Sequence, residues 1–210
     1  MTLHGYFRSS AAYRVRIAMH LKGLPFDQVS YHLRRGQQRT PDYLALNPQG
    51  LVPSLVLEDG TVLTQSLAII EWLDETHPSP RLVPTDPIRR AKARAFALAI
   101  SCDIHPVQNL KVLVALKKGG YSQEAVDEWA RSVNFEGLAA CERLIAEEPG
   151  PFCFGEAPTI ADVCLVPQMA NARRFGADLS SFNRLRAAEQ ASNSLAAFQA
   201  AAPQNQPDAE

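Results

Sequence analysis

The chain has 210 residues, of which 46% are hydrophobic and 20% are charged, and its formal net charge at pH 7 is −1. That length suits one large domain or two small ones, and the near-neutral charge gives no reason to expect a nucleic acid or an anionic membrane as partner. No apolar run approaches the roughly 20 residues of a membrane-spanning helix, and the N-terminus lacks the features of a signal peptide, so we expect a cytoplasmic protein.

The first 76 residues alternate between strand and helix patterns. Strands are predicted at 3–7, 26–32, 53–57 and 61–64, and helices at 11–22, 41–46 and 66–76. Asp59-Gly60 joins the last two strands, and Asp-Gly between short apolar runs is a strong hairpin signal. This order of elements is compatible with a thioredoxin-like domain, which we assign to residues 1–80.

Residues 77–88 contain four prolines, and we interpret them as a linker because proline stiffens a connection and cannot donate to a helix or sheet. Beyond it the sequence shows helical patterns only. Helices are predicted at 87–118 with a kink near Pro106, at 123–147, at 159–175 and in shorter pieces within 184–201, with a frayed tail at 203–210. Thr159 and Asp162 have the spacing of a capping box. The predicted fold class is therefore α/β plus all-α, with an all-helical domain over residues 81–210.

Cysteine and histidine spacing gives no sign of a metal site. Cys102, Cys141, Cys153 and Cys164 match neither a CxxC motif nor a common zinc pattern, and the five histidines are scattered. We expect reduced thiols and no bound metal.

Ser9 and Ser10 stand where the first strand ends and the first helix begins. Serine is a preferred helix N-cap, and a helix start attracts anions. Two hydroxyls there can stabilise a bound thiolate, although the pair taken alone is better explained as an ordinary cap than as a catalytic site. Arg14 and Arg16, two positions apart on the helix, cannot share one face, and we predict that both lie at the surface or an interface.

The segment Tyr-Phe-Arg-Ser-Ser-x-x-x-Arg-Val-Arg-Ile-Ala at 6–18 resembles the signature of the zeta class of glutathione transferases, the maleylacetoacetate isomerases. Similar segments recur nearly end to end, among them Gln65-Ser66, Gln108-Asn109-Leu110 and Gln206-Pro207-Asp208. The family usually has Ser-Ser-Cys where this chain has Ala11, so any role of that cysteine is absent here. Its fold is a thioredoxin-like domain followed by an all-helical glutathione-transferase C-terminal domain.

The resemblance implies a glutathione-dependent cis–trans isomerase that converts maleylacetoacetate to fumarylacetoacetate in aromatic amino-acid catabolism, acting as a homodimer. Glutathione adds to the cis double bond, the bond rotates, and glutathione leaves unchanged. Maleylpyruvate isomerase, or a general zeta-type transferase, is the alternative, and Asp103–Pro106 also suits the maleylpyruvate branch. A non-catalytic binding protein of the same fold is the second alternative.

The resemblance also implies which residues form the glutathione site. Ser9 is the predicted partner of the thiolate, with Ser10 beside it. Val52, before a cis Pro53, is predicted to pair with the cysteinyl backbone of glutathione, although base rates for an X–Pro bond favour a trans proline. The start of the third helix is predicted to hold the γ-glutamyl carboxylate, or else to be an ordinary serine cap. The predicted glutathione-binding set is Gln38, Val52, Pro53, Gln65, Ser66 and His105.

The implied substrate carries two carboxylates, so its site needs cations and hydrogen-bond donors. Arg8 precedes the serines and Arg174 ends a helix of the second domain, and arginine suits bidentate carboxylate recognition. His105 and Asn109 are predicted one turn apart on the long helix, so that both can face the cleft. The alternative for His105 is a capped or core histidine beside Pro106. The predicted substrate-binding set is Arg8, Asn109 and Arg174.

Overall fold

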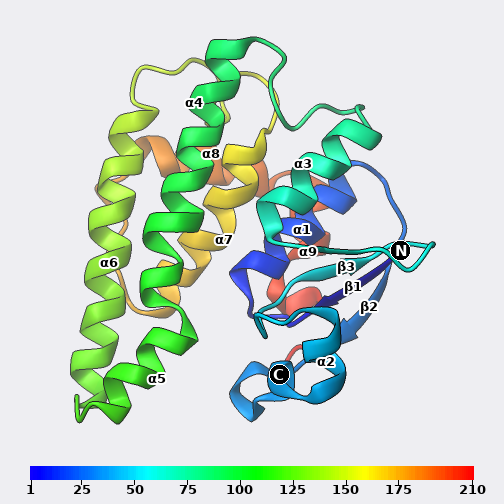
Figure 1. Cartoon of the computed structure of the whole chain (residues 1–210). Coiled ribbons are helices and arrows are strands. Elements are labelled where there is room, and N and C mark those ends of the chain that lie inside the picture. The colour runs from blue at the N-terminus through cyan, green and yellow to red at the C-terminus, as the bar shows by residue number, and fades with distance from the viewer. The chain divides into compact units, whose positions relative to one another are not determined.

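The computed structural model describes residues 1–210 and comprises two compact units (Figure 1). The first contains Met1–Leu82 together with Ser194–Glu210, and the second contains Val83–Asn193. No helix is both long enough and apolar enough to span a bilayer.

The first unit is built on a four-stranded sheet in the order β2-β1-β3-β4. Strand β1 (Thr2–Gly5) runs parallel to β2 (Asp27–Ser30) and antiparallel to β3 (Ser54–Val56), which forms a hairpin with β4 (Val62–Thr64). The helices of this unit are α1 (Ser10–Leu21), α2 (Pro41–Leu46), α3 (Ser66–Thr76) and α9 (Ala196–Ala201), with 3-10 turns η1 (Leu33–Arg35), η2 (Gln37–Arg39) and η5 (Pro203–Asn205). The predicted thioredoxin-like order of strands and helices is confirmed.

The second unit is all-helical, as predicted. It contains α4 (Pro87–Leu98), η3 (Ala99–Ile104), η4 (Pro106–Gln108), α5 (Leu110–Lys118), α6 (Gln123–Leu144), α7 (Ile160–Arg174) and α8 (Asn183–Asn193). The capping box at the start of α7 is confirmed: Asp162 Oδ2 accepts the N–H of Thr159 at 2.8 Å, and Thr159 Oγ1 accepts the N–H of Ala161 at 3.3 Å.

The helix predicted over 87–118 is irregular near Pro106, as expected, but the prediction of one continuous helix is wrong. The α-helical pattern changes to a π-helical stretch in η3, becomes a 3-10 turn at Pro106, and resumes only at Leu110. Proline has no N–H to donate to the preceding turn. Asn109 then has an extended backbone, and its Oδ1 caps α5 by accepting the N–H of Val112 at 3.3 Å.

The predicted fraying of residues 203–210 is also wrong. These residues form η5 and then pack on the rest of the first unit. Asp208 Oδ2 accepts the N–H of Phe7 at 3.0 Å, and Glu210 Oε1 lies 3.1 Å from His32 Nε2. The side chains of Asp208 and Glu210 thus hold residues 203–210 in place, although the polar composition of this segment suggested a disordered C-terminus. The structure accordingly groups residues 194–210 with the first unit, whereas the sequence assigned them to the second domain.

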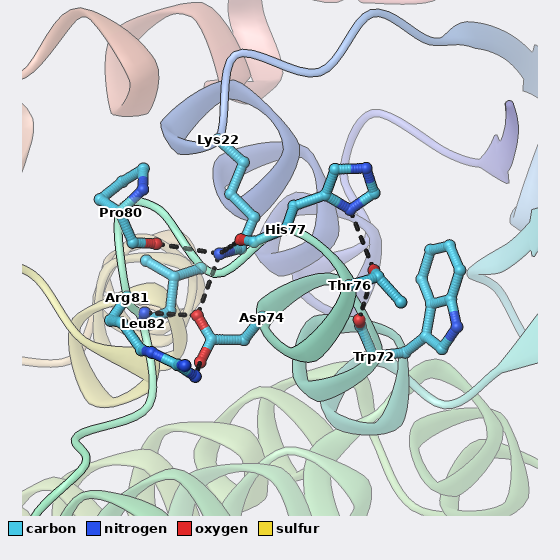
Figure 2. Close-up of polar contacts among 8 residues, drawn as sticks. All are labelled: Lys22, Trp72, Asp74, Thr76, His77, Pro80, Arg81 and Leu82. Carbon is cyan, nitrogen blue, oxygen red and sulfur yellow. Dashed lines mark hydrogen bonds and ion pairs between the residues drawn. The ribbon is translucent and has the colours of Figure 1, made fainter.

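A buried lysine fastens the start of the proline-rich segment to the first unit (Figure 2). Lys22 Nζ, at the end of α1, donates to Asp74 Oδ1 at 2.9 Å and to the carbonyl oxygens of His77 and Pro80 at 2.6 and 2.9 Å. The same Asp74 oxygen accepts the N–H of Leu82 at 2.6 Å. All three ammonium donors therefore have acceptors, which is the condition under which a buried charge is tolerated.

Candidate active site

The strand register brings the predicted glutathione-binding segments of the first unit to one end of the sheet. Gly5 at the end of β1 pairs with Ser30 at the end of β2, and Ser54 at the start of β3 lies between His4 and Thr64 at the end of β4. The segments that continue from these ends are 6–10, 31–39, 52–53 and 65–66. The topology thus gathers eight residues that the sequence analysis selected: Arg8, Ser9, Ser10, Gln38, Val52, Pro53, Gln65 and Ser66.

Ser9 is the N-cap of α1, and its Oγ accepts the N–H of Ala12 at 3.2 Å. No hydrogen bond within the chain uses its hydroxyl proton, so that proton remains available for an external acceptor. The backbone N–H groups of Ser10 and Ala11 also lack acceptors within the chain. Three donors are therefore grouped at a helix start, which is an arrangement that stabilises a bound anion such as a thiolate.

Arg8 lies in the turn between β1 and α1, half-buried, with its guanidinium 4.9 Å from the centre of the Phe7 ring. The turn is closed by the N–H of Ser9, which donates to the carbonyl oxygen of Tyr6 at 3.0 Å. A cation therefore stands one residue before the hydroxyl that is proposed to face the sulfur.

Val52 precedes a cis peptide bond to Pro53, as the resemblance implied. Its side chain packs with Tyr6, Phe7 and Tyr43 in a small apolar cluster, which fixes the segment beside the β1–α1 turn. No hydrogen bond within the chain engages the backbone N–H or C=O of Val52. A ligand with a peptide backbone can pair with these two groups as an added strand.

Gln65 is the N-cap of α3 and is the one residue other than glycine with a positive φ, at 67°. That conformation costs on the order of 1–3 kcal/mol and is typical of ligand-binding positions. Its amide donates to Gln49 Oε1 at 2.9 Å. The predicted serine cap is wrong, because Ser66 is the first helical residue and its Oγ accepts from Arg14 Nη1 at 3.3 Å.

Both arginines of α1 are buried, with 1% of each exposed, so the prediction of surface positions is wrong. The helix is covered by α3 on one side and α9 on another, and each guanidinium reaches an acceptor on a neighbouring segment. Arg14 places a positive charge under the start of α3, where it adds to the attraction of that helix start for a carboxylate. Sequence reasoning missed this role, although two arginines in an otherwise apolar helix were a signal that it is enclosed.

Gln38 lies in η2, half-buried, and its Oε1 is buried without a hydrogen-bond partner. An orphaned polar atom at this end of the sheet fits a site that a ligand completes. No cluster of histidine, cysteine, aspartate and glutamate side chains is arranged to hold a metal ion.

The predicted residues of the second unit belong to two of its segments. His105 is the C-cap that follows η3, and Asn109 is the N-cap of α5. The expectation that both lie one turn apart on a single helix is wrong, because Pro106 interrupts the helix. Arg174 is the exposed last residue of α7, and its guanidinium lies 5.1 Å from the centre of the Phe175 ring. The neighbouring Arg173 pairs with Glu189.

Comparison with known proteins identifies the family. Residues 8–76 match the model of the glutathione S-transferase N-terminal domain. Over 210 residues the chain is 46% identical to a maleylacetoacetate isomerase of Pseudomonas aeruginosa, covering 99% of this chain and 98% of the relative. A structure described as a maleyl pyruvate isomerase, a bacterial glutathione transferase in the zeta class, aligns with a TM-score of 0.97 at 42% identity over the whole of both chains. The chain belongs to the zeta class of glutathione transferases.

Two further relatives bear on the chemistry of this zeta-class transferase. A maleylpyruvate isomerase of Ralstonia is 43% identical over 212 residues, covering 99% of each protein. A maleylacetoacetate isomerase structure from Anaeromyxobacter dehalogenans, with dicarboxyethyl glutathione and citrate bound in its active site, aligns with a TM-score of 0.90 at 43% identity. It covers all of this chain and 93% of that one.

The strained conformation of Gln65 yields a prediction that separates binding from folding. Gln65→Ala and Gln65→Gly should both raise KM for glutathione and leave kcat nearly unchanged, because the proposed contact is remote from the sulfur. The glycine variant should be more stable than the alanine variant by about 1 kcal/mol, since glycine adopts positive φ without a steric penalty. Calorimetric titration with glutathione and thermal unfolding measure the two effects. Undiminished affinity in both variants would remove Gln65 from the site.

Proposed function

We propose that this protein is a glutathione-dependent cis–trans isomerase of a maleyl diketo acid, with maleylacetoacetate as its first candidate substrate and fumarylacetoacetate as the product. The observation that carries the proposal is the start of α1, where the Ser9 hydroxyl and two backbone N–H groups converge directly after Arg8. A thiolate and a carboxylate are the anions that such a site suits.

The residues at the sheet end fit glutathione. The backbone of Val52 offers one donor and one acceptor for the cysteinyl peptide unit, and the start of α3 above Arg14 suits the γ-glutamyl carboxylate. Gln38, with its orphaned oxygen, is proposed to reach the glycyl end. Bound glutathione supplies the thiol, whose reversible addition makes the cis double bond of the substrate a rotatable single bond.

This chain's own residues perform three tasks in the proposed reaction. Ser9 and the amides at the start of α1 favour the ionised sulfur, so that a nucleophile is present near neutral pH. Arg8 is proposed to bind a substrate carboxylate, and the roles of Arg174, His105 and Asn109 in the second unit are proposed from the resemblance alone. No group on the protein changes its oxidation state or forms a covalent bond, so catalysis rests on orientation and electrostatic stabilisation.

Maleylpyruvate is the second candidate substrate, because relatives of nearly equal similarity carry each of the two names. A general transferase activity on small electrophiles uses the same thiolate site. The non-catalytic alternative is disfavoured, because a binding module would not need the donors that surround Ser9.

The test is to incubate the purified protein with maleylacetoacetate and with maleylpyruvate, each with and without glutathione, and to follow loss of the cis acid. Glutathione-dependent formation of the trans acid is the expected result, and the ratio of kcat/KM for the two acids identifies the preferred substrate. Absence of turnover for both acids, at glutathione concentrations that saturate the protein, would refute the proposal.

Ala11, which replaces the family's cysteine, provides a further prediction. Ala11→Cys should have nearly the same kcat for isomerisation as the wild type, because the reacting thiol comes from glutathione. The new thiol would lie in the first turn of α1, where cysteines acidify and react readily. We therefore expect faster inactivation of this variant by peroxide, measured as residual activity over time. A large gain in turnover would instead indicate that the natural chain is impaired.

We also propose that the protein is a homodimer. Five apolar side chains of residues 88–114 are exposed by more than a third: Ile88 68%, Leu98 46%, Val107 37%, Leu110 37% and Val114 42%. A second copy of the chain packed on this segment would cover these side chains. Sedimentation should show a species of twice the chain mass of 23.1 kDa, and a monomer at micromolar concentration would contradict the proposal.

A further inference from the structure

Residues 206–210, which we call the C-terminal strap, are fastened to the first unit by a buried glutamine. Gln206 Nε2 donates to the carbonyl oxygens of Ala200 and Ala202 at 2.9 and 2.8 Å, and its Oε1 accepts from Gln28 Nε2 at 3.2 Å. Only 6% of Gln206 is exposed. The strap is therefore held against both α9 and β2 before it reaches Asp208.

Asp208 and Arg16 together hold the backbone of the β1–α1 turn. Asp208 Oδ2 accepts the N–H of Phe7 at 3.0 Å, and Arg16 Nη2 donates to the carbonyl oxygen of Phe7, also at 3.0 Å. The carbonyl oxygen of Tyr6 accepts from Ser9 N–H at 3.0 Å and from Arg16 Nη1 at 3.5 Å. The two peptide groups that precede Arg8 are thus fixed by one buried cation and one carboxylate.

Charge explains why a carboxylate suits this position. Burial of Arg16 lowers the pKa of its guanidinium to about 10, and the negative charge of Asp208 acts in the opposite direction. Arg16 also donates through Nε to the carbonyl oxygen of Ala201 at 3.0 Å, so it joins the turn to α9. Asp208 thereby stabilises the charged form of the side chain that holds the other side of the turn.

The β1–α1 turn contains Arg8 and leads into Ser9, so the way its backbone is held bears on catalysis. The Arg8 guanidinium stacks on the ring of Phe7, which is only 4% exposed, and Ser9 follows as the N-cap of α1. We infer that Asp208 is a positioning residue, which acts through the peptide N–H of Phe7 to orient Arg8 and Ser9 toward substrate and sulfur. The inference deepens the proposed function and rests on the roles proposed there for Arg8 and Ser9.

The experiment compares Asp208→Ala, Asp208→Asn and Glu210→Gln. Asp208→Ala should lower kcat/KM for the maleyl acid by about 10- to 100-fold, because misplacing reacting groups by an ångström costs that much. Asp208→Asn removes the negative charge near Arg16 but keeps an oxygen that can accept the N–H of Phe7, so it should lose much less activity than Asp208→Ala. Glu210→Gln alters an exposed acid of the same strap, whose partner is His32, and should match wild type.

Thermal unfolding shows whether each variant is folded at the assay temperature, and ultraviolet titration of bound glutathione reports the thiol pKa. A positioning role predicts a raised thiol pKa in Asp208→Ala and a value closer to wild type in Asp208→Asn. A loss of thermal stability with unchanged kcat/KM and thiol pKa would overturn the inference. Equal losses of activity in the Asn and Ala variants would also overturn it, because the shared acceptor would then be irrelevant.

The titration separates this inference from the proposed function. If wild-type protein isomerises neither acid, the proposed function fails, but the thiol pKa of bound glutathione still tests whether Asp208 positions Ser9. If wild-type protein is active and Asp208→Ala is equally active, only the positioning inference fails.

Discussion

Ser9→Ala should reduce kcat for isomerisation by about 100- to 1000-fold, while changing glutathione affinity much less. The hydroxyl proton of Ser9 has no acceptor within the chain, and it lies at a helix start beside two free backbone N–H groups. A preorganised donor of this kind stabilises the ionised sulfur more than the neutral thiol. Ultraviolet titration of bound glutathione should therefore show a higher thiol pKa in the variant than in wild type.

A matched control separates this effect from the loss of a helix cap. Ser9 Oγ caps α1 at 3.2 Å, and Ser122 Oγ caps α6 by accepting the N–H of Ala125 at the same distance. Each alanine substitution should cost about 0.5–2 kcal/mol of stability, but only Ser9→Ala should affect turnover. Ser9→Thr keeps the hydroxyl, so the pKa of the bound glutathione thiol in this variant should be close to the wild-type value. Near-normal turnover in Ser9→Ala would transfer the role to Ser10 or to the backbone.

The sequence predicted the elements of the first unit well because each has a local cause. Ser9 caps α1, Asp59-Gly60 turns the hairpin, and the register of short strands then gathers the loops at one end of the sheet. The cis bond before Pro53 was predicted from the resemblance alone, since nothing in the residues Val52-Pro53 distinguishes it from a trans bond.

The errors share another cause, which is contact between segments distant in the sequence. Arg14 and Arg16 have the composition of surface residues, and they are buried because Ser66 and Ala201 supply acceptors 52 and 185 positions away. Asp208 lies 201 positions from the N–H of Phe7 that it binds. Helical periodicity and local propensity contain no information about such partners, so the strap and the enclosed arginines became visible only in the folded chain.

Arg8→Met and Arg174→Met should each lower kcat/KM for a maleyl diketo acid. The loss should correspond to about 2–5 kcal/mol in the free energy of activation where the guanidinium forms a desolvated pair with a substrate carboxylate. It should correspond to less than about 1 kcal/mol where the guanidinium stays solvated. Both substrates are dianions at neutral pH, and a site that takes them out of water must compensate two charges. Arg8 is half-buried on the Phe7 ring, whereas Arg174 is exposed at the end of α7. We therefore expect the larger loss for Arg8.

The decisive measurement compares a dianionic substrate with an uncharged electrophile such as chlorodinitrobenzene in the same variants. Only the dianion should respond, because the neutral electrophile presents no carboxylate, and lysine at either position should rescue partly because it lacks the planar fork of arginine. Arg173→Met is the matched control for Arg174, since Arg173 is the neighbouring cation and pairs with Glu189 within the second unit. Equal losses for both substrates would mean that the arginines support the fold or glutathione binding, and the electrostatic argument for a dianionic substrate would then fail.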